Sequence, residues 1–429
     1  KKIVNLSDPT VASDASNKDY VDTQVALSGT NLNSFDKSTH TGDNSETEFT
    51  LSFTSQVTSP EAYLVTIDGV VQTPTTAYTV NVTTNKITFT SAPPTSAAIV
   101  VVPMGTTTVA NEASVVATGS TTARTLATRA ADVVNVLDYG AVSTETTAGF
   151  DSTAEIQAAI DAAKVSGAEV YFPAGEYLIS GAGLTLEQNG VHLRGAGRQQ
   201  TKLTYNGTGS AIAVTDGITA REYCSIRDLG FVCNNTTANT AIDLDKAPTT
   251  VLKNIYISEY NVGVYAKAAW NTTCDNIFMR NIRTKGFFFE TNCNDTGFIN
   301  CVVDGADQLI PPSRGLYAES CHGISWKGGA IEDFEYAFEF QACEVTIDCY
   351  VESNAKGVIY VPTGTATQIN VLNMYSFGNA PGEPLFTMVA GFIKVQQLND
   401  ATSGTQPTKI FHLTGGARAY YGDLIMNSA

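Results

Sequence analysis

The stretch that decides the fold is "VNVLDYGAVSTETTAGFDSTAEIQAAIDAAKVSGAEVYFPAGEYLIS", residues 134–180. Within it, Ser152-x-x-Glu155 is the pattern that caps the first turn of a helix. Apolar side chains then recur at helical spacing, and Gly167 follows as a residue typical of helix ends. The stretch therefore predicts a capped helix whose buried face consists of Ile156, Ala159, Ile160 and Ala163.

Strands are expected on the C-terminal side of this helix. Residues 169–173 ("EVYFP") and 176–180 ("EYLIS") flank a turn, and "VHLRGAGR" at 191–198 is a strand that ends in glycines. This order of "VNVLDYGA", helix, "VYFPAGEYLIS" and "LRGAGR" closely resembles the N-terminal part of pectate-lyase-like superfamily domains. The resemblance covers residues 134–198, and it is specific for fold but not for chemistry. It implies that residues 129–429 form a right-handed parallel β-helix.

A β-helix must repeat once per coil, because each coil stacks its apolar side chains on the coil below. An apolar-x-x-apolar-x-apolar pattern does recur, mostly at intervals of 22 to 26 residues, with two coils before its last copy. This register turns Cys274, Cys301, Cys321 and Trp326 inward, which favours buried thiols over disulfides and a core role for the tryptophan. The pattern starts at Ile226, Leu252, Cys274, Phe298, Cys321 and Ile369.

The N-terminal third has a different character. Residues 1–30 contain a short helix expected at 17–26, within an element that resembles one recurring in phage tail-fibre chains: Asp8-Pro9, Asp14-Ala15, Lys18 and Tyr20-Val21-Asp22. Residues 41–104 alternate apolar and polar in short runs around Asp68-Gly69, a type I′ hairpin signal, so they predict a small β-sandwich that also resembles a tail-fibre module. Residues 105–128 are expected to be a linker. The complete fold class is thus all-β, with a β-helix preceded by a β-sandwich and a short N-terminal helical segment.

Composition narrows the choice of partners and cofactors. A net charge of −17, from 25 Lys+Arg and 42 Asp+Glu, repels phosphate backbones and anionic lipids, so neither nucleic acid nor membrane insertion is expected. The eight cysteines contain no C-x-x-C, and no metal or other cofactor is expected. Because the chain begins at Lys1, we expect it to be part of a longer protein.

Carboxylates are the groups to seek if the β-helix cleaves polysaccharide, since hydrolysis uses a carboxylate pair and elimination uses a base. The densest acidic cluster holds Glu332, Asp333 and Glu335. Counting from the repeat starts predicts that these three lack a cationic partner, which would raise a carboxyl pKa. The cluster is the candidate catalytic site, and a solvated acidic turn is the alternative.

Other residues are candidates for carbohydrate binding. The same counting places Asp304 level with Arg280 and Lys327, and Asp307 level with Arg283, so that ion pairs between coils are expected. Trp270 falls in a loop between coils, where an aromatic ring can stack on a sugar. The predicted binding residues are Trp270, Asp304 and Asp307.

The two resemblances together imply a bacteriophage tail fibre or tailspike. Such chains are homotrimers held to other virion tail proteins through an N-terminal region, and they act extracellularly on the host surface. Recognition of a bacterial surface polysaccharide is the leading function, and a capsule or lipopolysaccharide depolymerase is the alternative. A secreted pectate-lyase-type enzyme is a third reading, which the fibre-like N-terminus disfavours.

Overall fold

The computed structural model describes residues 37–53, 59–104, 114–215, 217–235, 237, 239–307, 309–362, 367–401 and 407–426. The helix expected at 17–26 lies outside this range. Packing divides the chain into two compact units with a boundary between Leu126 and Ala127, and each unit is described by itself. Within the described ranges, no helix has the length and apolar character needed to cross a membrane.

The first unit contains two small antiparallel sheets that pack on a shared apolar core. Asp68 and Gly69 both have positive φ, 51° and 80°, as a type I′ hairpin requires. The Tyr78 hydroxyl donates to the Tyr63 carbonyl at 2.7 Å and ties the sheets together. The strands are β1 (Ser38–Thr41), β7 (Ala98–Pro103), β3 (Tyr63–Ile67) and β4 (Val70–Val71) in one sheet, and β2 (Glu48–Thr50), β6 (Lys86–Phe89) and β5 (Tyr78–Asn81) in the other, with the 3-10 turn η1 (Pro60–Ala62) between β2 and β3.

The described part of the expected linker has regular structure. Strands β8 (Ser114–Val116) and β9 (Ala123–Thr125) pair with each other in an antiparallel hairpin. A short helix, α2 (Leu126–Ala130), follows. Apolar periodicity did not reveal this hairpin because residues 115–116 and 123–125, its described side chains, are not buried.

The second unit begins with β10 (Val133–Asn135), the 3-10 turn η3 (Val136–Tyr139) and α3 (Thr153–Ser166). The four apolar side chains predicted to share a helix face are all buried, and Gly167 ends α3 with φ of 71°. Ser152 is the N-cap residue, as predicted, but its hydroxyl bonds the backbone of Val142 and makes no capping hydrogen bond. The Asp151 carboxylate accepts from the Thr153 amide at the start of the helix, at 3.0 Å.

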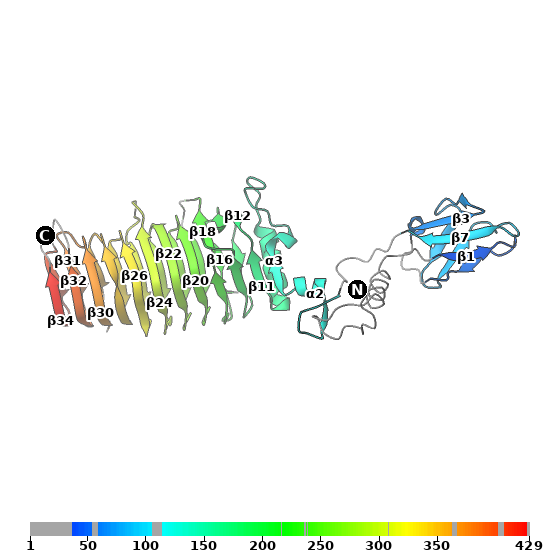
Figure 1. Cartoon of the computed structure of the whole chain (residues 1–429). Helices are drawn as coiled ribbons and strands as arrows, with labels where there is room; N and C mark the ends of the chain where they lie inside the picture. The colour runs from blue at the N-terminus through cyan, green and yellow to red at the C-terminus, as the bar shows by residue number, and fades with distance from the viewer. Residues whose placement is uncertain are drawn as a thin grey trace, which may run out of the picture. The chain divides into compact units, whose positions relative to one another are not determined.

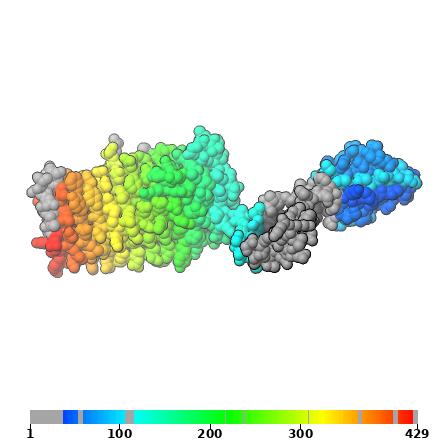
Figure 2. Space-filling view, in the orientation of Figure 1, coloured from blue at the N-terminus to red at the C-terminus, as the bar shows by residue number. Residues whose placement is uncertain are grey.

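The rest of the second unit is a parallel β-helix, visible in Figure 1 as a row of stacked strands and in Figure 2 as successive bands of colour. The all-β prediction is confirmed. One sheet has 15 strands and the other has ten within the described residues. The larger sheet adds to β10 the strands β11 (Glu169–Phe172), β12 (Gly175–Ile179), β14 (His192–Gly195), β15 (Thr201–Tyr205), β17 (Ser225–Arg227), β18 (Gly230–Cys233), β20 (Val251–Ser258), β22 (Thr273–Ile282), β24 (Gly297–Gly305), β26 (Ile324–Glu332), β28 (Glu344–Glu352), β30 (Gln368–Phe377), β32 (Phe392–Asp400) and β34 (Arg418–Met426). The ten-stranded sheet holds β13 (Leu184–Thr185), β16 (Ser210–Ala213), β19 (Thr240–Asp245), β21 (Val262–Lys267), β23 (Lys285–Glu290), β25 (Arg314–Glu319), β27 (Tyr336–Gln341), β29 (Gly357–Val361), β31 (Pro384–Met388) and β33 (Lys409–Leu413).

The first four repeat starts lie in register, since Ile226, Leu252, Cys274 and Phe298 are successive Cα partners. The start at Cys321 is wrong. Phe298 pairs with Trp326, because residues 306–313 lengthen the connection from β24 to β25, whereas β22 and β23 are joined by residues 283–284 alone. The start at Ile369 is displaced by two residues, since Ile347 pairs with Val371.

The predicted inward side chains do form the core. All eight cysteines are free thiols and buried, which confirms the preference for thiols over disulfides. Trp326 is 1% exposed and stacks on Phe298 with ring centres 5.1 Å apart. The core is one continuous cluster from Val134 to Leu398, so every coil depends on its neighbours.

Candidate functional site

Three carboxylates form a column on the outward face of the larger sheet. Asp304 at the end of β24 is the Cα partner of Glu332 in β26, and Glu332 is the partner of Glu352 in β28. Parallel strands place such partners about 4.8 Å apart. We call Asp304, Glu332 and Glu352 the carboxylate column. Counting along the sequence did not reveal this column, because Lys327, which was expected beside Asp304, pairs with Ile299 instead.

Burial and crowding raise the pKa values of Asp304, Glu332 and the adjacent Asp333. Burial raises the pKa of Glu332, and the charges of Glu352, Asp304 and Asp333 add to the effect. Burial also raises the pKa of Asp304, with Asp333 contributing and Arg280 opposing. The pKa of Asp333 rises through burial and the charges of Glu352 and Asp307. Asp304, Glu332 and Asp333 therefore hold protons at a higher pH than isolated carboxyls do.

The contacts around the column differ from the expected ion pairs. Arg280 does face Asp304, but its Nε lies 3.9 Å from Oδ2, which is beyond hydrogen-bond distance. The pair of Arg283 with Asp307 is wrong, because Arg283 binds Glu259 at 2.9 Å. Asp307 instead contributes its charge to the pKa of Asp333. Asp304 and Asp307 thus belong with Glu332 and Asp333, not to a rival location.

Glu335 does not belong to this group, and the expectation that it lacks a partner is wrong. It is 8% exposed and forms ion pairs with Arg314, at 3.2 Å, and with Lys356. Its carboxylate also accepts from the Ser313 amide at 3.0 Å. Burial alone would raise the pKa of Glu335, but these hydrogen bonds and charges lower it. Glu335 is a structural anion, joined through Arg314 to Glu339.

A second column of outward side chains runs beside the carboxylate column, two residues earlier in each strand. Its members, each the Cα partner of the next, are Tyr256, Phe278, Val302, Ala330, Tyr350 and Tyr375. Tyr256 and Phe278 stack at 6.0 Å, and Tyr350 and Tyr375 stack at 5.6 Å. Two rungs with small side chains thus separate two aromatic pairs, and they are the rungs that carry Asp304 and Glu332.

Tyr350 links the aromatic and acidic columns. Its hydroxyl donates to the Glu352 carboxylate, and burial together with that bond raises the pKa of Tyr350. The phenol therefore stays protonated and donates its hydrogen bond at physiological pH.

Trp270 lies apart from this surface. It is 43% exposed in the loop between β21 and β22, as predicted for a residue between coils. That loop precedes the start of β22, whereas Arg280 and the neighbouring carboxylate column lie near the strand ends. The structure does not bring Trp270 together with Asp304 and Asp307.

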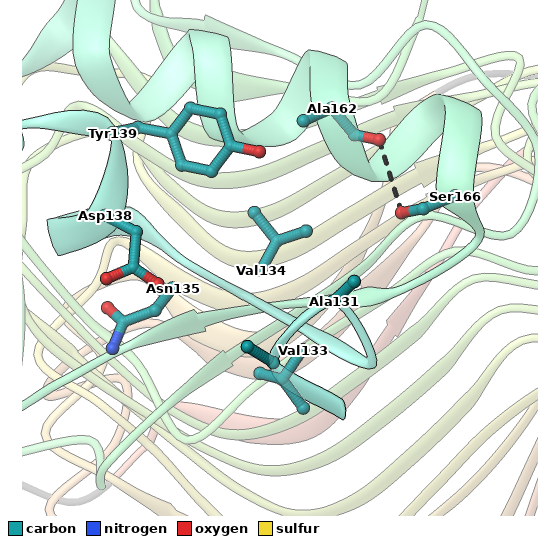
Figure 3. A pocket seen from close by; sticks show the side chains of 9 residues that line it. Ala131, Val133, Val134, Asn135, Asp138, Tyr139, Ala162 and Ser166 are labelled. Atoms are coloured by element: carbon teal, nitrogen blue, oxygen red, sulfur yellow. Dashed lines mark hydrogen bonds between the residues drawn. The ribbon is translucent and has the colours of Figure 1, made fainter. Parts of the chain in front are cut away.

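A separate pocket of about 330 Å³ lies where the β-helix begins. Figure 3 shows Val134 and Tyr139 beside α3, with the Ser166 hydroxyl bonded to the Ala162 carbonyl at 3.3 Å. Its lining is largely apolar and includes one carboxylate, Asp138. The pocket is formed by α2, β10, η3 and α3, and none of its lining residues belongs to the carboxylate column.

Sequence reasoning missed Glu352, Tyr350 and Phe278 as members of one surface. Glu352 lies level with the acidic residues of the neighbouring coils, and Tyr350 and Phe278 lie two residues earlier in their own coils. These shared outward positions are the sequence signal that could have identified them. The positions align only when the repeat start is moved from Cys321 to Trp326, because the long connection at 306–313 shifts the count for every later residue.

Comparison with known proteins supports the fold. The family model "Rhamnogalacturonase A/epimerase, pectate lyase-like" matches residues 133–229. The mannuronan C5-epimerase AlgE1 of Azotobacter vinelandii is 47% identical over 74 residues, which are 16% of this chain and 5% of that protein. Its relative AlgE4 is 45% identical over 73 residues, or 16% of this chain and 13% of AlgE4. The chain thus spans a small part of the curated relatives that it matches.

Two solved tailspike structures share the architecture. The enzymatically active domain of bacteriophage CBA120 tailspike protein 2 aligns with a TM-score of 0.52 at 12% identity, covering 73% of this chain and 50% of that one. The gp42 tailspike of an Acinetobacter phage aligns with a TM-score of 0.51 at 13% identity, covering 70% and 63%. At such identities the likeness establishes the fold. The second unit is a parallel β-helix, of which residues 133–229 resemble the pectate-lyase-like family.

Proposed function

We propose that this protein cleaves a polysaccharide by hydrolysis at the carboxylate column. The observation that carries the proposal is the placement of Asp304, Glu332 and Glu352 on three adjacent rungs, with the pKa values of Asp304 and Glu332 raised. Glycoside hydrolysis needs one protonated and one ionised carboxyl on either side of the scissile bond. The mannuronan C5-epimerases among the relatives, which act on a polysaccharide, and the enzymatically active domain of the similar tailspike support this proposal.

Glu332 is the proposed proton donor because it lies in the middle of the column. The charges of both neighbours, Asp304 and Glu352, favour its protonated form. An ionised neighbour one rung away then attacks the anomeric carbon while Glu332 protonates the departing glycosidic oxygen, and water later hydrolyses the glycosyl ester with Glu332 as the base. Adjacent rungs are about 4.8 Å apart, so carboxyls carried on them can meet at the spacing of about 5 Å that separates the two carboxyls in enzymes that retain the anomeric configuration. We therefore expect retention.

Mutation of the column tests the proposal. Glu332→Gln and Asp304→Asn should each lower kcat by about a hundredfold or more, the usual range for a lost general acid or base. Glu344→Gln, on an exposed residue at the other end of β28, is the matched control and should retain activity. The assay counts new reducing ends on polysaccharides purified from candidate bacteria, and NMR of the first product reports its anomeric configuration.

Three outcomes would contradict the hydrolytic mechanism. Unsaturated sugars in the products would indicate elimination. Full activity of Glu332→Gln would remove the column from the chemistry. Tight binding of a polysaccharide without any cleavage would support the adhesive function instead, with recognition of the host surface as the whole role.

The biological setting that we propose is a phage tailspike acting outside the cell on a bacterial surface polysaccharide. The fibre-like sequence elements before the β-helix support this setting, and the N-terminal region would hold other virion tail proteins. The proposed assembly is a homotrimer. Light scattering of the fragment should give about three times its 45.5 kDa mass, and a monomer at all concentrations would rule the trimer out.

A further inference from the structure

Two arginines lie on the outward face near Phe278, one rung before the carboxylate column. Arg280 lies two residues along β22, and its side chain is 62% exposed. Arg198 extends from the loop after β14, with its guanidinium carbon 6.0 Å from the centre of the Phe278 ring. One of its nitrogens, Nη1, donates to the backbone and side-chain oxygens of Asn276, each at 3.2 Å.

Within the described residues, neither guanidinium group forms a close ion pair with a carboxylate. Arg194 and Arg283 do, since Arg194 binds Glu169 at 2.6 Å and Arg283 binds Glu259 at 2.9 Å. Arg280 reaches only to 3.9 Å from Asp304. In a chain with 42 acidic and 25 basic residues, two such cations on one outward face favour the approach of an anion.

The ring itself offers a face to a ligand. Tyr256 stacks on one side of Phe278 with an interplanar angle of 12°, so the stack runs along the column of strands. The next rung carries the smaller Val302, which leaves the other side of the ring without an aromatic neighbour. A pyranose placed over Val302 would contact Phe278 and lie on the same rung as Asp304.

We propose that Phe278, Arg198 and Arg280 form a subsite for a sugar that carries a carboxylate, such as a hexuronic acid, next to the bond that is cleaved. The proposal rests on the proposed function and names its substrate class, an acidic polysaccharide. The apolar face of the sugar packs on Phe278, and its carboxylate accepts hydrogen bonds from the guanidinium groups. Planar guanidinium groups suit this recognition better than ammonium groups do.

The opposite flank of the column has a different chemistry. Tyr350 and Tyr375 stack there, Tyr375 is 44% exposed, and the cation–π contacts of the described residues include none at either ring. That flank therefore suits an uncharged sugar. The two flanks orient the polymer, with its acidic unit on the Phe278 side of the scissile bond.

The test compares polymers that differ only in charge. Alginate, polygalacturonate, hyaluronan and carboxylated bacterial capsular polysaccharides are each assayed beside their carboxyl-reduced forms, together with dextran and pullulan. Cleavage is measured by reducing ends, and binding by calorimetry with the Glu332→Gln variant. We expect action on carboxylated polymers, with affinity at least about tenfold weaker after reduction, as for the loss of a charged hydrogen bond.

Variants assign the effect to the subsite. Arg280→Gln and Arg198→Gln should each raise KM for the carboxylated polymer about tenfold and leave KM for the carboxyl-reduced polymer unchanged. Arg418→Gln, at an exposed arginine of β34, is the matched control and should change neither. Thermal melting verifies that each variant is folded, and Arg280, being exposed, is the safer of the two.

The outcomes separate the two proposals. Cleavage of neutral and carboxyl-reduced polymers as fast as of their carboxylated forms would overturn the subsite and leave the hydrolytic function standing. Unchanged KM in both arginine variants would do the same. If no polymer of the panel is bound or cleaved, the proposed function fails and the subsite fails with it.

Discussion

Replacement of Arg314 by methionine should destabilise the β-helix strongly. Arg314 is 5% exposed and joins two buried carboxylates, Glu335 and Glu339, which are 8% and 7% exposed. Methionine fills similar space but leaves Glu339 without its cation and Glu335 with Lys356 alone. Breaking a buried pair from one side costs about 3–5 kcal/mol, because an uncompensated charge remains in a poorly solvated place.

The assay is urea unfolding of the second unit at neutral pH, followed by circular dichroism, with thermal melting beside it. An unfolding free energy lower by about 3–5 kcal/mol corresponds to a fall in Tm on the order of 10 °C for a unit of this size. Arg280→Met is the matched control. Its side chain is 62% exposed and 3.9 Å from Asp304, so the change should stay within about 0.5 kcal/mol.

The pH dependence provides a second check on the same residue. The pKa of Glu335 is lower in the folded protein than in the unfolded chain, so its contribution is present above the unfolded pKa of about 4.3 and disappears as pH falls through the folded pKa. The difference between wild type and Arg314→Met should therefore shrink in acid. A loss below about 1 kcal/mol, or equal losses in both arginine variants, would refute the assignment of Glu335 to a structural network.

Three further predictions follow from the packing and the charges. Gly329→Ala should unfold the β-helix at lower urea by several kcal/mol, since φ is +75° and the new Cβ would lie 1.9 Å from the Cys301 carbonyl oxygen, whereas Gly190→Ala, at φ +69° with open space around it, should cost only about 1 kcal/mol. Thiol titration should count eight groups in denaturant and almost none in the native protein, and a count near zero in denaturant without reductant would indicate disulfides. Glu332→Gln should raise Tm at neutral pH. The pKa of Glu332 is higher in the folded protein than in the unfolded chain, so the wild type loses stability as pH rises from about 4 through the folded pKa, and the glutamine variant does not. An unchanged or lower Tm at neutral pH would contradict the crowding of the column.

The fold was accessible from local patterns. The helix at 153–166, the strands around residues 174–175 and the inward apolar positions of successive coils each follow from spacing within a few residues. A β-helix stacks like on like, so a local pattern repeated in order also specifies the tertiary contacts. The buried thiols and the buried Trp326 were predicted for this reason.

The site depended on register between coils, which residue spacing alone does not fix. An insertion between strands, such as residues 306–313, lengthens one coil without disturbing the strands on either side. The count then places Lys327 beside Asp304, although the backbone pairs Asp304 with Glu332. For the same reason the expected partners of two other carboxylates were wrong. Glu335, expected to lack a cation, pairs with Arg314 and Lys356. Asp307, expected to pair with Arg283, does not, because Arg283 binds Glu259. A surface loop of any length leaves the buried apolar contacts intact, but it changes which charged residues lie level with each other on neighbouring coils. The carboxylate column and its aromatic flanks are therefore seen only in the three-dimensional structure.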